Sequence, residues 1–146
     1  MVKIYLDVNI YNRPFDDQSQ VRIRLETIAI FSILQRIRRG DLTLLWSFMI
    51  DYENSLNPYD DVRLEIEMAS SLAKEKIYPH EFVFTTAKGL ESKGVKPRDA
   101  LHLACATKGR AEYFLTCDDR LIKRVSLLGL DIKAMNPIRF IGMEVN

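Results

Sequence analysis

Four acidic residues lie at or just past the ends of predicted strands and helices, where carboxylates can gather around a cation. They are Asp7, Glu53, Asp99 and Asp118. Open α/β sheets place their binding sites at the carboxyl ends of strands, so acids delivered there by separate elements can meet. Hard cations such as Mg²⁺ and Mn²⁺ prefer oxygen ligands, and several carboxylates offset their charge. The spacing therefore predicts a metal site built from acids.

Short apolar runs predict the strands that position two of these acids. Residues 2–6 are rich in branched and aromatic side chains and end on Asp7, and residues 42–47 form a second run with Glu53 six residues later. A carboxylate beside a hydrophobic sheet is costly without a cation or hydrogen-bond donors, which favours a ligand role for Asp7.

Residues 97–121 predict a helix, a strand and a turn that position the other two acids. The helix has Pro97 in its first turn and ends at Gly109, as the preferences of proline and glycine indicate. The apolar run at residues 113–115 predicts the strand. Asp99 lies in the first helical turn and Asp118 follows the strand.

Ordinary structural roles compete with the ligand role. Asp99 can cap its helix or interact with the positive end of the helix dipole, which would also keep it ionised. Asp118 can cap the next helix, and Asp119 is its rival as a ligand. Asp51 is the rival of Glu53, and two residues that far apart on a helix point to different faces.

Three polar residues accompany the acids. Asn9 and Thr116 can orient a water or a carboxylate by hydrogen bonding, or can serve as turn and cap residues. His102 shares a helix face with Asp99, where a lone histidine is more often a core or supporting residue than a ligand. The sequence offers no nucleophilic triad, glycine-rich dinucleotide fingerprint or P-loop.

The remaining chain alternates predicted helices with strands. Helices are expected over residues 18–39, 59–78, 80–93 and 121–127, and a late strand over residues 130–134. No repeat or linker divides the chain, so residues 1–146 are expected to form one domain. The alternation predicts an α/β fold with a central, mainly parallel sheet of about four or five strands, flanked by helices, with Asp7 on a central strand.

Composition limits the partners and the compartment. The chain of 146 residues is 47% hydrophobic and 28% charged, and its net charge of +1 requires any nucleic-acid surface to be a local patch. Cys105 and Cys117 match no zinc or redox motif, which favours free thiols and a cytoplasmic location. The sequence shows no signal peptide and no apolar run of the roughly 20 residues that a membrane helix needs, so no membrane partner is expected.

The order of these motifs resembles the acidic constellation of PIN-domain nucleases. The resemblance covers nearly the whole chain and rests on Asp7-Val8-Asn9, on Glu53, on Asp99 in PRDALHLACA and on Asp118 in FLTCDDRL. The family spacing selects Glu53 over Asp51, and the T-x-D match selects Asp118 over Asp119.

The resemblance implies a PIN-like three-layer fold and a ribonuclease site. Asp7, Glu53, Asp99 and Asp118 would hold Mg²⁺ or Mn²⁺, with Asn9, Thr116 and Asp119 in support. Many small members resemble VapC-type toxins, which an antitoxin protein silences. The leading hypothesis is therefore a metal-dependent endoribonuclease that hydrolyses RNA phosphodiester bonds, with an antitoxin as its partner.

Two other classes of function remain open. One is a catalytically silent PIN-like module that binds RNA or protein, although such a module has no need of four acids. The other is a phosphohydrolase that uses Asp7 as its nucleophile. Enzymes of that kind resemble D-x-D at this place, whereas here the third residue is Asn9.

The predicted helix over residues 18–39 is apolar around more of its surface than one core face needs. Such a surface predicts an interface, and a homodimer is the expected assembly, as in PIN-domain toxins. The alternative is that later helices cover the apolar surface within one chain. The same helix carries five arginines that are either a solvated face or contacts for phosphates, namely Arg22, Arg24, Arg36, Arg38 and Arg39.

Overall fold

The computed structural model describes residues 1–143, which surround a five-stranded sheet in the order β3-β2-β1-β4-β5. All four strand pairings are parallel. The strands are β1 (Lys3–Leu6), β2 (Thr43–Ser47), β3 (Glu75–Ile77), β4 (Tyr113–Leu115) and β5 (Lys133–Met135). The predicted α/β class and parallel sheet are confirmed, and Asp7 follows the central strand.

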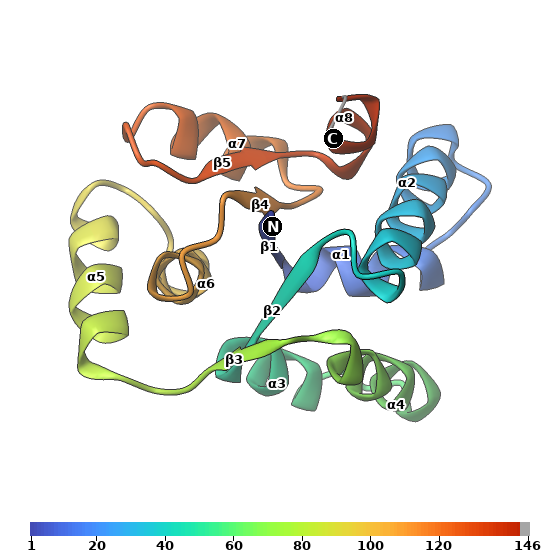
Figure 1. The fold of residues 1–146 in the computed structure, drawn as a ribbon, viewed down its shortest axis with the longest axis horizontal. Coiled ribbons are helices and arrows are strands. Elements are labelled where there is room, and N and C mark those ends of the chain that lie inside the picture. Colours follow the sequence, from blue (N-terminus) through green and yellow to red (C-terminus); the bar gives the residue numbers. More distant parts are fainter. Residues whose placement is uncertain (144–146) are drawn as a thin grey trace.

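Helices cover both faces of this sheet and make three layers (Figure 1). The α5 and α6 helices lie side by side on one face, and α2 and α8 pack together on the other. The helices are α1 (Val8–Asn12), α2 (Val21–Arg38), α3 (Phe48–Ser55), α4 (Asp60–Ala69), α5 (Glu81–Ser92), α6 (Pro97–Lys108), α7 (Asp119–Ser126) and α8 (Pro137–Gly142), with 3-10 turns η1 (Arg13–Phe15) and η2 (Ser70–Leu72). Within residues 1–143, no helix is long and apolar enough to cross a membrane.

The three middle strands are apolar along their length because both of their faces are covered. Ile4, Tyr5 and Leu6 of β1 are completely buried, as are Phe114 and Leu115 of β4. The ring of Tyr5 stacks on that of Phe114 with 5.4 Å between centroids. This packing fixes the ends of β1 and β4 side by side, which is where two of the predicted site residues follow.

The predicted single helix over residues 59–78 is wrong, because it contains α4, η2 and the edge strand β3. The hydroxyls of Ser70 and Ser71 donate to the carbonyls of Glu67 and Met68, at 2.7 and 2.9 Å. Serine side chains that bond nearby carbonyls compete with helix continuation. The chain beyond them then pairs with β2, which buries Ile77.

The later elements are displaced by a few residues from their predicted places. The helix expected over residues 121–127 begins at Asp119, and the strand expected over residues 130–134 lies at residues 133–135. The α8 helix was not predicted. Asn136 caps it by accepting a hydrogen bond from Ile138 N–H at 2.8 Å.

A buried carboxylate on α2 ties this helix to the C-terminal elements. Glu26 is completely buried, and its carboxylate accepts a 2.5 Å hydrogen bond from the Asn136 amide. Arg13 Nε lies 3.2 Å from the same carboxylate. Burying a charge is costly unless it is paired and hydrogen-bonded, so these partners fix how α2 sits on the sheet.

Gly109 ends α6 as predicted, but for a different reason. Its φ of −80° is open to any residue, and it is Arg110 that takes the left-handed conformation, with φ 60°. A Cβ on Gly109 would lie 2.5 Å from Leu45 Cδ1. Glycine is therefore needed here for the close approach of α6 to β2.

The strained backbone of Arg110 generates a stability prediction. A non-glycine residue in the left-handed region costs about 1–2 kcal/mol, part of which glycine recovers despite its larger unfolded-state entropy. Arg110→Gly should therefore raise the free energy of unfolding by about 0.5 kcal/mol or more, measured by urea denaturation. Gly129→Ala, at φ 66° with open space around its Cβ position, should lower it. A less stable Arg110→Gly protein would contradict this account.

Candidate active site

Asp7 ends the central strand with both carboxylate oxygens engaged. Its Oδ1 accepts from the N–H of Val8 at 2.8 Å and so caps α1, and its Oδ2 accepts from the Thr116 hydroxyl at 2.8 Å. The side chain is 4% exposed. Burial raises the pKa of Asp7, and the hydrogen bonds from Thr116 and Val8 offset part of that shift.

Hydrogen bonds of Asn9 and Thr116 link the end of β1 to the end of β4. The Asn9 amide nitrogen donates to Asp7 Oδ2 at 3.2 Å and to the Thr116 hydroxyl at 3.0 Å. The Asn9 carbonyl oxygen accepts from Cys117 N–H at 3.0 Å, and Thr116 Oγ1 accepts from Asp118 N–H at 3.1 Å. These two residues therefore orient Asp7 and set the path of the chain toward Asp118.

Asp118 and Asp119 have separate roles at the start of α7. Asp118 Oδ1 caps the helix by accepting from the N–H groups of Arg120 and Leu121, at 3.0 and 3.2 Å. Asp119 forms a bidentate ion pair with Arg22 of α2, in which both N···O distances are 2.8 Å. That guanidinium lowers the pKa of Asp119. Asp119 is thus committed to α2, whereas Asp118 keeps its Oδ2 free of hydrogen bonds from residues 1–143.

Asp99 lies in the first turn of α6 and neither caps this helix nor accepts a hydrogen bond from any side chain or backbone group of residues 1–143. Burial, together with the negative charges of Asp7 and Asp118, raises the pKa of Asp99 to about 6. Burial and the neighbouring carboxylates thus oppose the ionisation that we expected the helix dipole to favour, and a carboxyl with a pKa of about 6 is still mainly ionised at pH 7.

Glu53 reaches the site from α3 and contacts His102 of α6. Its carboxylate Oε1 pairs with the Nε2 of His102, which is 1% exposed. The other imidazole nitrogen, Nδ1, lies 2.6 Å from the hydroxyl of Tyr5. Sequence reasoning treated His102 as a general core or supporting residue and missed Tyr5. The only available signal was the spacing of His102, one turn after Asp99.

The parallel sheet brings the four predicted acids to one edge, on four different elements. Burial is the main cause of the raised pKa of Asp99, and the charges of Asp7, Asp118 and Glu53 add to it, so these three carboxylates lie within electrostatic reach of Asp99. As they stand, no three His, Cys, Asp or Glu side chains of residues 1–143 are grouped tightly enough to enclose an ion. The donor set still fits a hard cation, because its atoms are carboxylate oxygens whose mutual repulsion a cation would relieve.

A groove of about 540 Å³ runs from Glu53 along α1, η1 and the start of α4. Its lining combines aromatic, amide and charged side chains, including Asn12, Phe15, Glu53, Tyr59 and Arg98. The amides of Asn12 and Asn57 hydrogen-bond across it at 3.1 Å, and Tyr59 is 68% exposed. The aromatic and amide groups and Arg98 suit the bases and phosphates of a single-stranded nucleic acid, whereas the carboxylates of Asp16, Glu53 and Asp61 in the same lining would need a cation to offset their charge.

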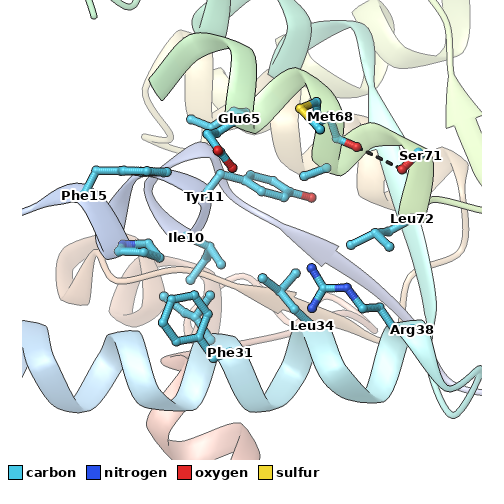
Figure 2. Close-up of a pocket in the computed structure, with 14 residues that line it drawn as sticks. Ile10, Tyr11, Phe15, Phe31, Leu34, Arg38, Glu65, Met68, Ser71 and Leu72 are labelled. Carbon is cyan, nitrogen blue, oxygen red and sulfur yellow. Dashed lines mark hydrogen bonds between the residues drawn. The ribbon is translucent and has the colours of Figure 1, made fainter. Parts of the chain in front are cut away.

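A second, more apolar pocket of about 580 Å³ lies between α2 and α4. Figure 2 shows Phe31, Leu34 and Arg38 of α2 facing Glu65 and Met68 of α4. None of the four acids lines it. Its apolar lining suits a protein segment more than a charged substrate.

The sequence of this chain matches no protein-family model and no curated protein, whereas its fold matches several solved structures. FitAcB from Neisseria gonorrhoeae matches with a TM-score of 0.60 and 16% identity, over 92% of this chain and 97% of that one. VapBC2 from Rickettsia felis, bound to a DNA fragment from its promoter, matches with a TM-score of 0.62 and 15% identity, over 91% of this chain and 98% of that one. VapBC-1 from nontypeable Haemophilus influenzae matches with a TM-score of 0.59 and 16% identity, over 93% of this chain and 98% of that one.

The fold is PIN-like. Because both chains are covered almost completely in each match, the matched chain is close in length to this one and shares its whole architecture. The PIN-like three-layer fold predicted from the sequence is therefore confirmed, and identities of 15–16% carry the likeness no further than the fold.

The raised pKa of Asp99 predicts how metal-free stability depends on pH. A carboxyl that binds its proton more tightly in the folded state stabilises the fold at low pH, and this contribution is lost as pH rises from about 4 to about 6. In EDTA, Asp99→Asn should therefore raise Tm at pH 7.5 and have little effect at pH 4.5, measured by circular dichroism. A Tm that falls at pH 7.5 would show that the Asp99 charge is not repelled by its neighbours.

Proposed function

We propose that this protein is a Mg²⁺- or Mn²⁺-dependent endoribonuclease that hydrolyses phosphodiester bonds in RNA. The observation that carries the proposal is the arrival of four acids from separate elements at one edge of the sheet, where Asp99 accepts no hydrogen bond from residues 1–143. Burial, and then the charges of Asp7 and Asp118, raise the pKa of Asp99 to about 6. Mutual repulsion of this kind lowers stability, and the charge of a bound cation would reverse it.

The four acids would have two different roles in holding the cation of the proposed reaction. Asp7 and Glu53 are held in place by hydrogen bonds, while Asp99 and Asp118 offer carboxylate oxygens that residues 1–143 leave open. All four would hold Mg²⁺ or Mn²⁺. When bound, the ion would supply a Lewis acid that lowers the pKa of a water and stabilises charge on the phosphodiester oxygens.

The 540 Å³ groove beside Glu53 supports RNA as the substrate. Arg98 lies one residue before Asp99 and stands over the ring of Tyr52, at 5.7 Å from its centroid. A guanidinium at that place would pair with a phosphate next to the bond that is cut, and exposed Tyr59 would stack on a base. Of the arginines on α2, Arg22 and Arg39 are instead paired with Asp119 and Asp41, which removes them as free phosphate contacts.

The two alternative functions are less well supported. A silent binding module gains nothing from repelling carboxylates that lower its stability. Phosphohydrolases with an aspartate nucleophile resemble D-x-D at this place, whereas here the third residue is Asn9, whose amide donates to Asp7 Oδ2 at 3.2 Å. An aspartyl-phosphate trapped on Asp7 would nevertheless favour the phosphohydrolase.

The proposed partner is an antitoxin protein. Two of the matched structures are VapBC assemblies, whose name belongs to the toxin class that the sequence resembles. The apolar pocket between α2 and α4 could bind a segment of such a partner. Arg38 and Glu65, which line the pocket, could pair with polar groups of that segment (Figure 2).

Four charge-removing substitutions test the nuclease. Asp7→Asn, Glu53→Gln, Asp99→Asn and Asp118→Asn should each abolish Mg²⁺- or Mn²⁺-stimulated RNA cleavage, because each keeps the shape of the side chain and removes a charge that the cation requires. Cleavage of a labelled RNA measures this, and circular dichroism checks that the fold persists. Asp119→Asn is the milder control, since Asp119 pairs with Arg22. Folded acid variants with full activity would refute the assignment.

We also propose that the chain forms a homodimer through the outer face of α2. Val21, Leu25, Ile28 and Phe31 are 48–60% exposed and recur at the three- and four-residue spacing of one helix face. The alternative that later helices cover this surface does not hold for these four side chains. A continuous apolar helix face is typical of a two-fold interface.

Light scattering at micromolar concentration tests the dimer. The wild-type chain should have twice its mass of 16.9 kDa. Ile28→Glu should give the 16.9 kDa monomer because it places a charge in the middle of the proposed interface. Leu127→Glu, at a side chain that is 72% exposed and directly follows α7, should leave the dimer intact. A wild-type monomer would exclude this assembly.

A further inference from the structure

A line of buried hydrogen bonds runs from the middle of the sheet to Glu53. The N–H of Ile50 donates to Ser47 Oγ at 3.4 Å, Ser47 Oγ lies 2.6 Å from the Tyr5 hydroxyl, and Tyr5 lies 2.6 Å from His102 Nδ1. The Nε2 of His102 then contacts Glu53. Tyr5 and Ser47 are completely buried and His102 is 1% exposed.

Only one direction of donation in this line gives every N–H and O–H a strong acceptor. The Glu53 carboxylate accepts from Nε2–H of His102, so Nδ1 of a neutral imidazole is free to accept from the Tyr5 hydroxyl. Tyr5 in turn accepts from Ser47, whose oxygen accepts from Ile50 N–H. The reverse direction leaves the Ser47 hydroxyl proton with the Cys105 thiol, a weak acceptor.

Each member of the line shares an element with one of the four acids. Tyr5 is two residues before Asp7 on β1, and Ser47 caps α3, the helix that carries Glu53. His102 is one turn after Asp99 on α6. The line thus links three of the elements that deliver carboxylates, through groups that solvent does not reach.

We propose that Tyr5 and Ser47, acting through His102, are positioning residues that hold the Glu53 carboxylate toward Asp99. This inference rests on the proposed nuclease function for its consequences, but not for its geometry. The Tyr5 hydroxyl holds Nδ1 of His102 while Nε2–H meets the Glu53 carboxylate, so the ring that holds Glu53 is itself held from the sheet. Supporting partners of this kind orient the ligands of metal sites, and their loss costs about 10–100-fold in affinity or activity.

Nitrogen-15 NMR of the metal-free protein tests the geometry without any activity. The chain has two histidines, so His102→Gln identifies the His102 signals by their loss. The wild-type imidazole should carry its hydrogen on Nε2 alone. In Tyr5→Phe, which keeps the ring packed on Phe114, the Nδ1 signal should shift toward that of an acceptor nitrogen with no hydrogen bond. An unchanged Nδ1 signal in Tyr5→Phe, or a wild-type hydrogen on Nδ1, would overturn the proposal.

RNA cleavage tests the consequence. Tyr5→Phe should lower kcat about 10–100-fold with KM for RNA unchanged. His102→Gln keeps an amide donor and should retain more activity than His102→Leu. Tyr113→Phe, which removes a hydroxyl from the neighbouring strand, should behave as wild type. Wild-type kcat in Tyr5→Phe would overturn the positioning role.

The two measurements separate this proposal from the nuclease proposal. If the wild-type chain cleaves no RNA while the NMR result is as expected, the nuclease has failed and the positioning of Glu53 stands. If the chain cleaves RNA and the Nδ1 signal of His102 does not depend on Tyr5, the nuclease stands and the positioning role has failed.

Discussion

Repulsion between carboxylates at one edge of the parallel sheet is the constraint on which the rest of the structure depends. Asp7, Glu53, Asp99 and Asp118 arrive on different elements, and the pKa of Asp99 is raised to about 6 by burial and by the other acids. Such a cluster would spread apart unless its supports were rigid. The supports are strands buried on both faces, together with hydrogen bonds that lead from the acids into the core.

The α2 helix combines a face buried in the core with the exposed apolar face that we propose as an interface. Its inner face carries the buried Glu26, which Arg13 and Asn136 hold in place, while its outer face exposes Ile28 and Phe31. A pairing inside the core fixes the orientation of the helix with little freedom to rotate. The apolar outer face is therefore presented in a defined direction, as a docking surface requires.

The sequence predicted those features that depend on local pattern. Apolar runs and breakers located β1, β2, β4 and α6, and the acids that follow them marked the sheet edge as the site. The edge strand β3 was missed because Glu75 and Lys76 are polar, and only their pairing with β2 makes them a strand. The contact between Tyr5 and His102 joins residues 97 positions apart, so no local pattern could reveal it.

The four acids are supported in two different ways, and this difference bears on how the site would work. Asp7 and Glu53 are held by donors, from Thr116 and Asn9 in one case and from His102 in the other. Asp99 accepts no hydrogen bond from residues 1–143, and Asp118 uses one oxygen to cap α7. Asp7 and Glu53 fix where the site would lie, because their oxygens cannot turn without breaking buried hydrogen bonds. Asp99 and Asp118 supply negative charge that no neighbouring group neutralises among residues 1–143. Their oxygens can turn toward a bound cation with little loss of existing hydrogen bonds. Rigidity and charge are thus carried by different residues, so each can be altered separately.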